Sequence, residues 1–394
     1  MSGPLQGIRV IDVSAVVSGP LATMLLADQG ADVIKVETPE VGDILRLNPN
    51  SRGNMSSFYL NCNRSKRAMV LDLSKEEARE ILKGLIKDAD VFVQNWRPGA
   101  AERLGLGWED LHAMNPNLIY CAISGYGPSG PYSNRRVYDP IIQGLTGHVA
   151  VQNNPDVPIP DLVRNIVADK SSAYTAAQAI TSALFARERG AGGQRIDVPM
   201  MDASLAFFWP DGMLKHTFVG EGAQKGAALY EIYRLWETRD GRVIWFANND
   251  SEYYGLFRAL KKPEWCHDPR FCDTPSRIEN LEELGAQIMQ AVAEFSTQEL
   301  LDRMIAEDVP AGAVLDLEAV LEDPQLQHNE AIVEQDHPMA GRIRMARPAA
   351  RFHQTPQHIS RPAPGPGEHT EEILREAGLS AEEIDGLRTR GAIS

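Results

Sequence analysis

The 394-residue sequence has few cysteines, a deficit of positive charge and no long apolar run. Its four cysteines (Cys62, Cys121, Cys266 and Cys272) form no CxxC pair and have no histidine at metal-ligand spacing, so we expect reduced thiols and no metal site. A formal net charge of −15 disfavours binding to nucleic acid, which needs a basic face. No run approaches the ~18 apolar residues of a membrane span, and the first residues lack the pattern of a secretory signal. These absences predict a cytoplasmic protein.

Several catalytic signatures are also missing. The turn SAVVSGP has no GxGxxG, which disfavours a nicotinamide enzyme. Ser18, Ser171 and Ser172 lack a GxSxG setting, which disfavours a serine hydrolase. The histidines are scattered without HExxH or another metal-ligand spacing, and His148 alone lies near a segment of interest, as a base or as a structural residue. In so acidic a protein, any site for an anionic ligand must be built from local arginines.

The first 200 residues alternate short apolar strands with helices. Strands are predicted in GIRVIDVS, ADVIKVE, AMVLDL, DVFVQN, NLIYCAIS and GQRIDVPM. Helices are predicted in SGPLATMLLADQG and in SKEEAREILKGLIKDA, where Ser74 and Glu77 fit a capping box. This alternation predicts an α/β fold with a doubly wound, mostly parallel, Rossmann-like sheet. Ligands of such sheets bind at the carboxyl ends of the strands, here Ser14–Ser18, Glu37–Thr38, Leu73–Ser74, Gln94–Arg97 and Ser124–Gly127.

The pattern changes after residue 200. YRLWETRDGRVIWFAN predicts a β-hairpin turning at Asp240–Gly241, and amphipathic helices follow to about residue 330. GRIRMARPAARF has strand character, RPAPGPGEH is typical of a linker, and the last stretch predicts two short helices. We therefore expect a large ligand-binding α/β domain over 1–200 completed by 330–394, a linker helix over 201–224, and a smaller α+β domain over 225–325.

Two charged features have simple local interpretations. NRSKRAMVLDL places Arg64, Lys66 and Arg67 before a strand, a run typical of a solvated edge. Asp169 opens an alanine-rich helix expected from 169 to about 189, where aspartate is a preferred N-cap. A carboxylate at a helix N-terminus is stabilised as the anion, which is the form that acts as a nucleophile. From these residues alone the cap is the favoured interpretation of Asp169, and a nucleophile at the same position stays open.

Two segments offer groups for a phosphorylated ligand. In QNWRPGAAERLG, Trp96 suits a purine ring, and Arg97 and Arg103 suit phosphates; the alternative is a core tryptophan beside solvated arginines. In SGYGPSGPYSNRRVYDPIIQ, glycines precede a cluster of charged and aromatic residues, with an ordinary surface loop as the alternative. The members of that cluster are Arg135, Arg136, Tyr138 and Asp139.

The order and spacing of these blocks resemble the class III CoA-transferase family, typified by formyl-CoA transferase and the carnitine-related CoA-transferases. The resemblance runs through GIRVIDVSAVVSGPLATMLLADQGADVIKVE, NWRPGAAERLGLGWEDL, SGYGPSGPY, YDPIIQG, ADKSSA and GQRIDVPMMDA. It implies an acyl-CoA:carboxylate CoA-transferase whose partners are acyl-CoA and small carboxylic acids. Coenzyme A is then a co-substrate, with no permanently bound cofactor and no metal. The resemblance also implies an interlocked homodimer.

Residue by residue, the resemblance makes Asp169 the covalent nucleophile that carries CoA as an aspartyl thioester. The residues it places against CoA are Val16, Val17, Ser18, Asn95, Trp96, Arg97, Arg103, Arg136, Val137, Tyr138 and Asp139. The sequence departs from formyl-CoA transferase where Val17 replaces a glutamine, where Thr38 replaces an arginine, and where FANNDSEYYG replaces a glycine-rich loop. These departures count against formate and oxalate as substrates. Asn248, Asn249 and His148 suggest instead a polar acyl group, such as a succinyl donor.

Two alternatives stay open at this point. The α-methylacyl-CoA racemases of the same family carry a His–Asp pair where this sequence has Tyr138–Asp139, and a phenol of pKa about 10 is a poor base for an α-proton. A non-catalytic CoA-binding subunit is the other alternative, against which the intact Asp169 argues.

Overall fold

The computed structural model describes residues 3–152, 161–224 and 226–394, so the end of the loop predicted for 125–160 lies outside the described residues. The chain divides into one unit formed by Met1–Ala228 with Asn329–Ser394, and a second formed by Leu229–His328. Residues 201–224, for which the sequence predicts a linker helix, belong to the first unit, but helix α8 (Met200–Gly212) covers only the first half of them; a short 3-10 turn (Leu214–His216) and a non-helical stretch follow.

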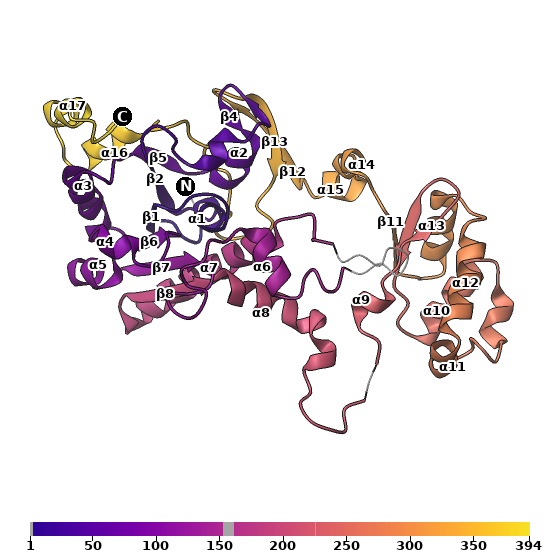
Figure 1. The fold of residues 1–394 in the computed structure, drawn as a ribbon. Helices are drawn as coiled ribbons and strands as arrows, with labels where there is room; N and C mark the ends of the chain where they lie inside the picture. Colours follow the sequence, from indigo (N-terminus) through magenta and orange to yellow (C-terminus); the bar gives the residue numbers. More distant parts are fainter. Residues whose placement is uncertain (1–2, 153–160, 225) are drawn as a thin grey trace. The chain divides into compact units, whose positions relative to one another are not determined.

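A six-stranded sheet forms the centre of the first unit (Figure 1). All neighbouring strands are parallel, in the order β5-β2-β1-β6-β7-β8. The strands are β1 (Arg9–Asp12), β2 (Asp32–Glu37), β5 (Arg67–Val70), β6 (Val91–Gln94), β7 (Ile119–Ser124) and β8 (Gln194–Pro199). The chain first builds outward from β1 to β5 and then, on the other side of β1, from β6 to β8. The predicted doubly wound parallel sheet is confirmed, and its topological switch point lies between β1 and β6.

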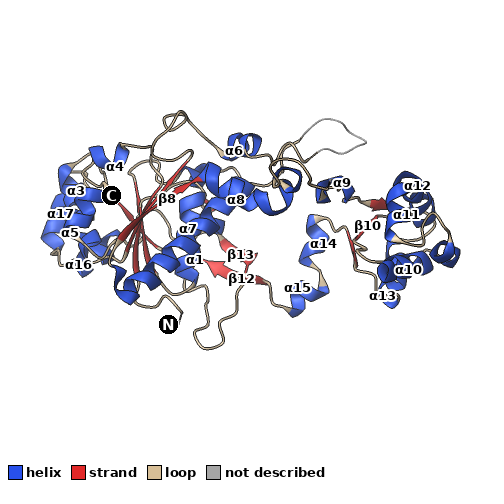
Figure 2. Cartoon of the chain, turned by 90° about the horizontal axis from the view of Figure 1, so that it is seen from below, coloured by secondary structure: helices blue, strands red, loops and turns tan. Residues whose placement is uncertain are grey.

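Helices cover both faces of this sheet (Figure 2). One face carries α1 (Ser18–Asp28), α7 (Val167–Ala186) and α8, and buried alanines of α7 such as Ala173 and Ala176 let it lie close to the sheet. The other face carries α3 (Glu76–Lys87), α5 (Trp108–Met114), α16 (Thr370–Glu376) and α17 (Ala381–Thr389). The two predicted C-terminal helices are thus confirmed. Shorter helices are α2 (Ser57–Asn63), α4 (Ala100–Arg103) and α6 (Asp139–Leu145).

Two hairpins complete the first unit. The short pair is β3 (Ser51–Arg52) with β4 (Met55–Ser56), and the longer is β12 (Ile332–His337) with β13 (Gly341–Ala346). The sequence pattern predicts β13 but not β12. The residues of β12, IVEQDH, have no strong strand pattern of their own and form a strand by pairing with β13. The predicted proline-rich linker is packed: Ala363 to Gly365 are buried, and the carbonyl of Pro364 accepts a hydrogen bond from Arg46.

The second unit has a three-stranded antiparallel sheet in the order β11-β10-β9. Its strands are β9 (Trp236–Glu237), β10 (Arg242–Trp245) and β11 (Ala311–Ala313), so the hairpin predicted at Asp240–Gly241 is confirmed. The helices are α9 (Leu229–Ile232), α10 (Asp250–Ala259), α11 (Thr274–Glu279), α12 (Leu281–Val292), α13 (Thr297–Ala306), α14 (Leu317–Leu321) and α15 (Pro324–His328). Phe257, Phe271 and Phe295 anchor its core.

The solvated edge predicted for Arg64, Lys66 and Arg67 is wrong, because all three side chains are buried. Arg64 pairs with Asp28 of α1 at 2.8 Å, and Lys66 pairs with Asp12 of β1 at 3.1 Å. The run therefore contributes internal counter-charges that no local pattern distinguishes from surface charge.

The capping box predicted at Ser74 is also wrong. α3 begins at Glu76, and the Ser74 hydroxyl donates to Asp72 at 2.6 Å instead of accepting from the helix. A complete capping box stands at the start of α17, between Ser380 and Glu383. Among the described residues, no helix is both long and apolar enough to cross a bilayer.

Candidate active site

The turn from β1 to α1 lies at the switch point, beside the loop that follows β6. Asn95 of that loop bridges the two: its Oδ1 accepts the N–H of Ala15 at 3.0 Å, and its Nδ2 donates to the carbonyl of Ala15 at 2.7 Å. The carboxyl ends of the two central strands are therefore tied together at the edge where parallel sheets bind ligands.

The same turn contains a backbone conformation that is unusual for its residue type. Val16 has φ 69°, a left-handed value that a β-branched side chain rarely adopts. Its N–H donates to Asp43 Oδ1 at 3.0 Å, and Asp43 in turn pairs with the buried Lys35 at 2.9 Å. Lys35 also donates to the carbonyl of Ser14 at 2.9 Å. Buried charge beneath the turn thus holds its backbone in place.

Asp169 lies in the first turn of α7, but it is not the N-cap that the sequence predicts. The N-cap position is Ile166, whose side chain makes no capping bond. The backbone N–H of Ser18, the first residue of α1, lies near the Asp169 carboxyl group and acts to lower its pKa. The N-terminal end of α1, which carries partial positive charge, therefore meets this carboxyl group.

The cap of α7 comes from elsewhere in the chain. Asp139, at the start of α6, accepts the backbone N–H of Asp169 at 2.9 Å, although 30 residues separate them. Gln143 of α6 donates to Asp139 at 2.6 Å and accepts the N–H of Val163 at 3.0 Å, which fixes the chain just before α7. Sequence analysis missed Gln143, since nothing local marks a buried glutamine as a brace.

The surroundings of Asp169 raise its pKa to about 7. Burial is the main cause, the nearby charge of Asp139 adds to it, and the Ser18 amide acts in the opposite direction. The expected dipole-stabilised anion is therefore corrected: in the unliganded chain the carboxyl group is poised near neutrality. That poise suits a group that must be ionised for attack yet sits in a water-poor place.

His148 follows α6 and is buried against α8. Its ring lies 4.9 Å from that of Phe208, and its Nε2 has no hydrogen-bond partner among the described residues. Burial lowers its pKa, while a hydrogen bond to the backbone of Ser204 and the charge of Asp139 act against that. His148 is therefore a neutral ring with one free nitrogen in the neighbourhood of Asp139.

Besides Asn95, the segment after β6 contains three further residues that the resemblance places against CoA. Trp96 is partly buried against the α3 face of the sheet, whereas Arg97 and Arg103 are exposed. Neither arginine has an ion-pair partner within the described part of the chain. The core alternative therefore holds in part for Trp96, while both guanidinium groups stay available to an anion.

The segment after β7 is partly exposed. Arg136 is exposed and Tyr138 is 66% exposed, while Val137 packs toward the α7 face. Gly125 permits this approach, because a Cβ at that position would lie 2.4 Å from Val137 Cγ1. Val17 and Ser18 of the first turn are buried, and Val16 is partly buried.

Thr38 lines a cavity of about 410 Å³ at the carboxyl end of β2. Its wall includes Arg46, which forms an ion pair with Glu37 at 2.7 Å and stacks on Tyr59. The guanidinium group of Arg46 is therefore already paired. This cavity is on the same sheet edge as the Ser14–Ser18 turn.

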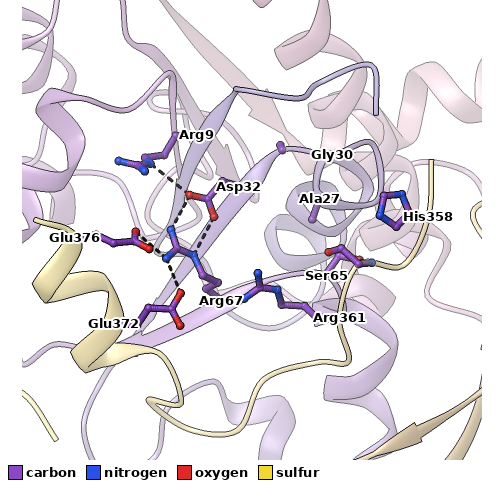
Figure 3. A pocket seen from close by; sticks show the side chains of 12 residues that line it. Arg9, Ala27, Gly30, Asp32, Ser65, Arg67, His358, Arg361, Glu372 and Glu376 are labelled. Carbon is purple, nitrogen blue, oxygen red and sulfur yellow. Dashed lines mark hydrogen bonds and ion pairs between the residues drawn. The ribbon is translucent and has the colours of Figure 1, made fainter. Parts of the chain in front are cut away.

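A second cavity, of about 310 Å³, lies at the opposite, amino-terminal edge of β1, β2 and β5 (Figure 3). Arg67 stands at its centre, within 2.9 Å of Asp32, Glu372 and Glu376. These pairs tie α16 to the edge of the sheet, and the cavity is remote from the strand ends that carry Asp169 and Ser18.

In the second unit, Asn249 caps α10 by accepting the N–H of Glu252 at 3.0 Å. Its side chain thus has a structural task, and the substrate contact predicted for Asn248 and Asn249 stays a prediction. All four cysteines are free, and the described residues contain no cluster of three or more potential metal ligands.

Comparison with known proteins identifies the family. The model of CoA-transferase family III matches residues 5–370. The chain is 35% identical to an acyl-CoA transferase of Fusarium pseudograminearum, covering 99% of this chain and 88% of that protein. It is 32% identical to the human succinyl-CoA:glutarate CoA-transferase, over 95% and 86%, and 32% identical to the formyl-CoA:oxalate CoA-transferase of Bradyrhizobium sp. (strain ORS 278), over 100% and 98%.

Solved structures agree. Rv3272 from M. tuberculosis matches with a TM-score of 0.83 and 29% identity, over 94% of this chain and 99% of that one. A CAIB/BAIF family protein from Brucella suis matches with a TM-score of 0.82 and 30% identity, over 96% and 100%. The chain belongs to CoA-transferase family III, a family of enzymes, as the resemblance implied.

Proposed function

We propose that the protein moves CoA from an acyl-CoA donor to a carboxylic acid acceptor through a thioester on Asp169. The carboxylate of Asp169 attacks the thioester carbonyl, the CoA thiolate leaves, and a mixed anhydride forms. The thiolate then attacks the aspartyl carbonyl carbon, which releases the first acid as its carboxylate. The acceptor carboxylate attacks the aspartyl-CoA thioester, which frees the thiolate and forms a second mixed anhydride. The thiolate then attacks the acceptor's carbonyl carbon in that anhydride, which yields the new acyl-CoA and regenerates the Asp169 carboxylate.

The observation that carries this proposal is the position of Asp169, whose carboxyl group lies in the first turn of α7 near the N-terminal end of α1 at Ser18. When a thiolate attacks the aspartyl carbonyl, negative charge develops on its oxygen. A fixed backbone donor at the N-terminus of α1 stabilises that charge, and the loss of one such donor costs about 10²–10³ in rate. Arg97 and Arg103, both exposed and unpaired among the described residues, are the groups we assign to the phosphates of CoA.

A polar, dicarboxylic acyl group fits the site better than formate or oxalate. His148 supports this assignment, because its buried Nε2 has no partner among the described residues and a polar substrate would supply one. A succinyl-CoA:glutarate CoA-transferase is among the relatives, but a formyl-CoA:oxalate CoA-transferase is equally similar at 32% identity, so His148 and the sequence departures carry the choice. By contrast, the exposure of Tyr138 disfavours racemisation, which needs a base held against the substrate in a water-poor site.

We also propose that the enzyme is a homodimer and works in the cytoplasm. Large apolar side chains on α6, α7 and α8 are exposed in the single chain, which is typical of a surface covered by a partner. They are Ile141, Leu145, Tyr174, Phe185, Phe207 and Trp209. Four free cysteines suit a reducing compartment.

The intact mass of the protein tests the proposed chemistry directly. After incubation with succinyl-, glutaryl- or formyl-CoA, we expect wild type to gain the mass of CoA less water, and neutral hydroxylamine to remove it. Asp169→Ala should gain nothing with the same donor. A CoA adduct that persists in Asp169→Ala would place the nucleophile elsewhere. Exchange of the α-proton into deuterated water without any adduct would favour racemisation.

Removal of the neighbouring charge is expected to shift the acid limb of the pH–rate profile. Because Asp139 raises the pKa of Asp169, Asp139→Asn should lower that pKa, so that kcat/KM begins to fall at a lower pH than in wild type. Asp110→Asn, at an exposed aspartate on α5, is the matched control and should leave the limb in place. An unchanged limb in Asp139→Asn would mean that Asp169 is not the group titrating in catalysis.

A further inference from the structure

The residue after Ala15 in the first turn is strained. A β-branched residue at φ 69°, as in Val16, is strained and persists only where the surroundings impose that conformation. Such strain tends to be stored at functional sites, and this turn leads directly into the amide that meets Asp169.

Three consecutive residues are held here by side chains from three different places in the chain. The Ser14 carbonyl accepts from Lys35, both peptide groups of Ala15 bond the amide of Asn95, and the Val16 N–H donates to Asp43. The side-chain oxygen of Asn95 and one of its N–H groups are thus both hydrogen-bonded to Ala15. The resemblance assigned Asn95 to CoA, but these contacts give it a different task.

We propose that Asn95 and Asp43 are positioning residues, which hold Val16 in its left-handed conformation so that the Ser18 N–H stays aimed at the Asp169 carboxyl group. The proposal rests on the proposed function of Asp169. Without these bonds Val16 relaxes to negative φ, the turn shifts, and the donor that stabilises charge on the aspartyl carbonyl is lost. Asn95 therefore acts on the chemical step, across the switch point, and not on the affinity for CoA.

Steady-state kinetics separate the two roles. We expect Asn95→Ala to lower kcat by about 10²-fold, the cost of one misplaced charge-stabilising donor. Its KM for the acyl-CoA should change by less than about threefold, as for an interaction made only in the transition state. Arg97→Ala is the matched control, because Arg97 is exposed and lies two residues after Asn95. In this variant KM should rise about tenfold while kcat is kept. A tenfold rise in KM with unchanged kcat in Asn95→Ala would overturn the proposal.

Hydrogen–deuterium exchange gives a readout that does not depend on activity. Amides of residues 14–18 should exchange faster in Asn95→Ala than in wild type, with the rest of the sheet unchanged; unchanged protection of this turn would contradict the proposal. If Asn95→Ala does not fold, Asn95→Asp keeps the acceptor for the Ala15 N–H while it replaces the donor to the Ala15 carbonyl with a negatively charged oxygen, and the same two measurements apply. Failure of the proposed function would show separately, as the absence of a CoA adduct on wild type.

The strain itself can be tested in a double-mutant cycle. Glycine adopts φ 69° without penalty, so in a Val16→Gly background the turn no longer needs the full clamp. We expect the loss of kcat caused by Asn95→Ala to be several-fold smaller in that background than in wild type. An equal loss in both backgrounds would show that Asn95 does not act through the conformation of Val16.

Discussion

Asp169→Asn is expected to transfer CoA at least about 10⁴-fold more slowly than wild type and, at pH 8, to be the more stable protein. An amide cannot form the mixed anhydride or the thioester, so the covalent route is closed. The shape of the side chain and its acceptor for the Ser18 N–H are nevertheless kept. Loss of activity should therefore come without loss of fold.

The gain in stability follows from the raised pKa of Asp169. The folded chain holds the proton until about pH 7, whereas the unfolded chain releases it near the ordinary carboxyl pKa of 3.8. Between these values the unfolded state is favoured increasingly as the pH rises, so wild type loses stability up to about pH 7 and stays at that level above it. Each unit of pKa is worth about 1.4 kcal/mol, and partial exposure of Asp169 reduces the total, so we expect a gain of about 1–3 kcal/mol for the variant at pH 8.

Thermal unfolding of both proteins across pH 5–8 measures this gap. It should widen between pH 5 and pH 7 and remain constant above, while transfer rates are taken on the same samples. Asp110→Asn is the control and should follow wild type at every pH. A variant that retains transfer within tenfold of wild type, or that is less stable than wild type at pH 8, would contradict the assignment of Asp169 as a buried, poised nucleophile.

The local features of this fold were predictable because they are written in short apolar segments. The strands of the central sheet, the hairpin at Asp240–Gly241 and the C-terminal helices each follow from a pattern within about ten residues. Where a residue has a choice of partners, the local pattern failed. Ser74 fits a capping box but bonds Asp72, and Asp169 fits an N-cap but leaves that task to Asp139, 30 residues earlier.

The location of the candidate site could be predicted from the sequence, but the contacts within it could not. The strand-end rule places Ser18 and Asn95 on one sheet edge, and the topology has them there. That Asn95 bonds Ala15, and that Lys35 and Lys66 are buried beneath the turn, depends on contacts between segments distant in sequence. A lysine inside a strand or a basic run looks the same to local analysis whether it faces water or a buried carboxylate.

The second large effect is expected at Asp12, on which those buried cations depend. Asp12 is fully buried at the end of β1, 3.1 Å from Lys66 Nζ, and it accepts hydrogen bonds from Ser14 and Thr23. Burial acts to raise its pKa, but the charges of Lys66 and Lys35 outweigh this and hold the pKa at about 2. Asp12→Ala leaves the buried Lys66 ammonium group without its ion-pair partner, whereas Lys35 keeps Asp43, and we expect the change to cost about 3–5 kcal/mol of stability.

Chemical denaturation followed by circular dichroism measures this cost, with Asp110→Ala on the exposed face of α5 as the control, expected within about 0.5 kcal/mol of wild type. If the penalty arises from the stranded charge, removal of its partner should relieve it. Asp12→Ala combined with Lys66→Met is therefore expected to lose less than the two single variants together, with a coupling of about 1–3 kcal/mol. Strict additivity would mean that Asp12 stabilises the turn only through Ser14 and Thr23. In that case Asp12→Ala and Lys66→Met would each affect the Ser14–Ser18 turn, and with it the position of the Ser18 N–H, through separate contacts.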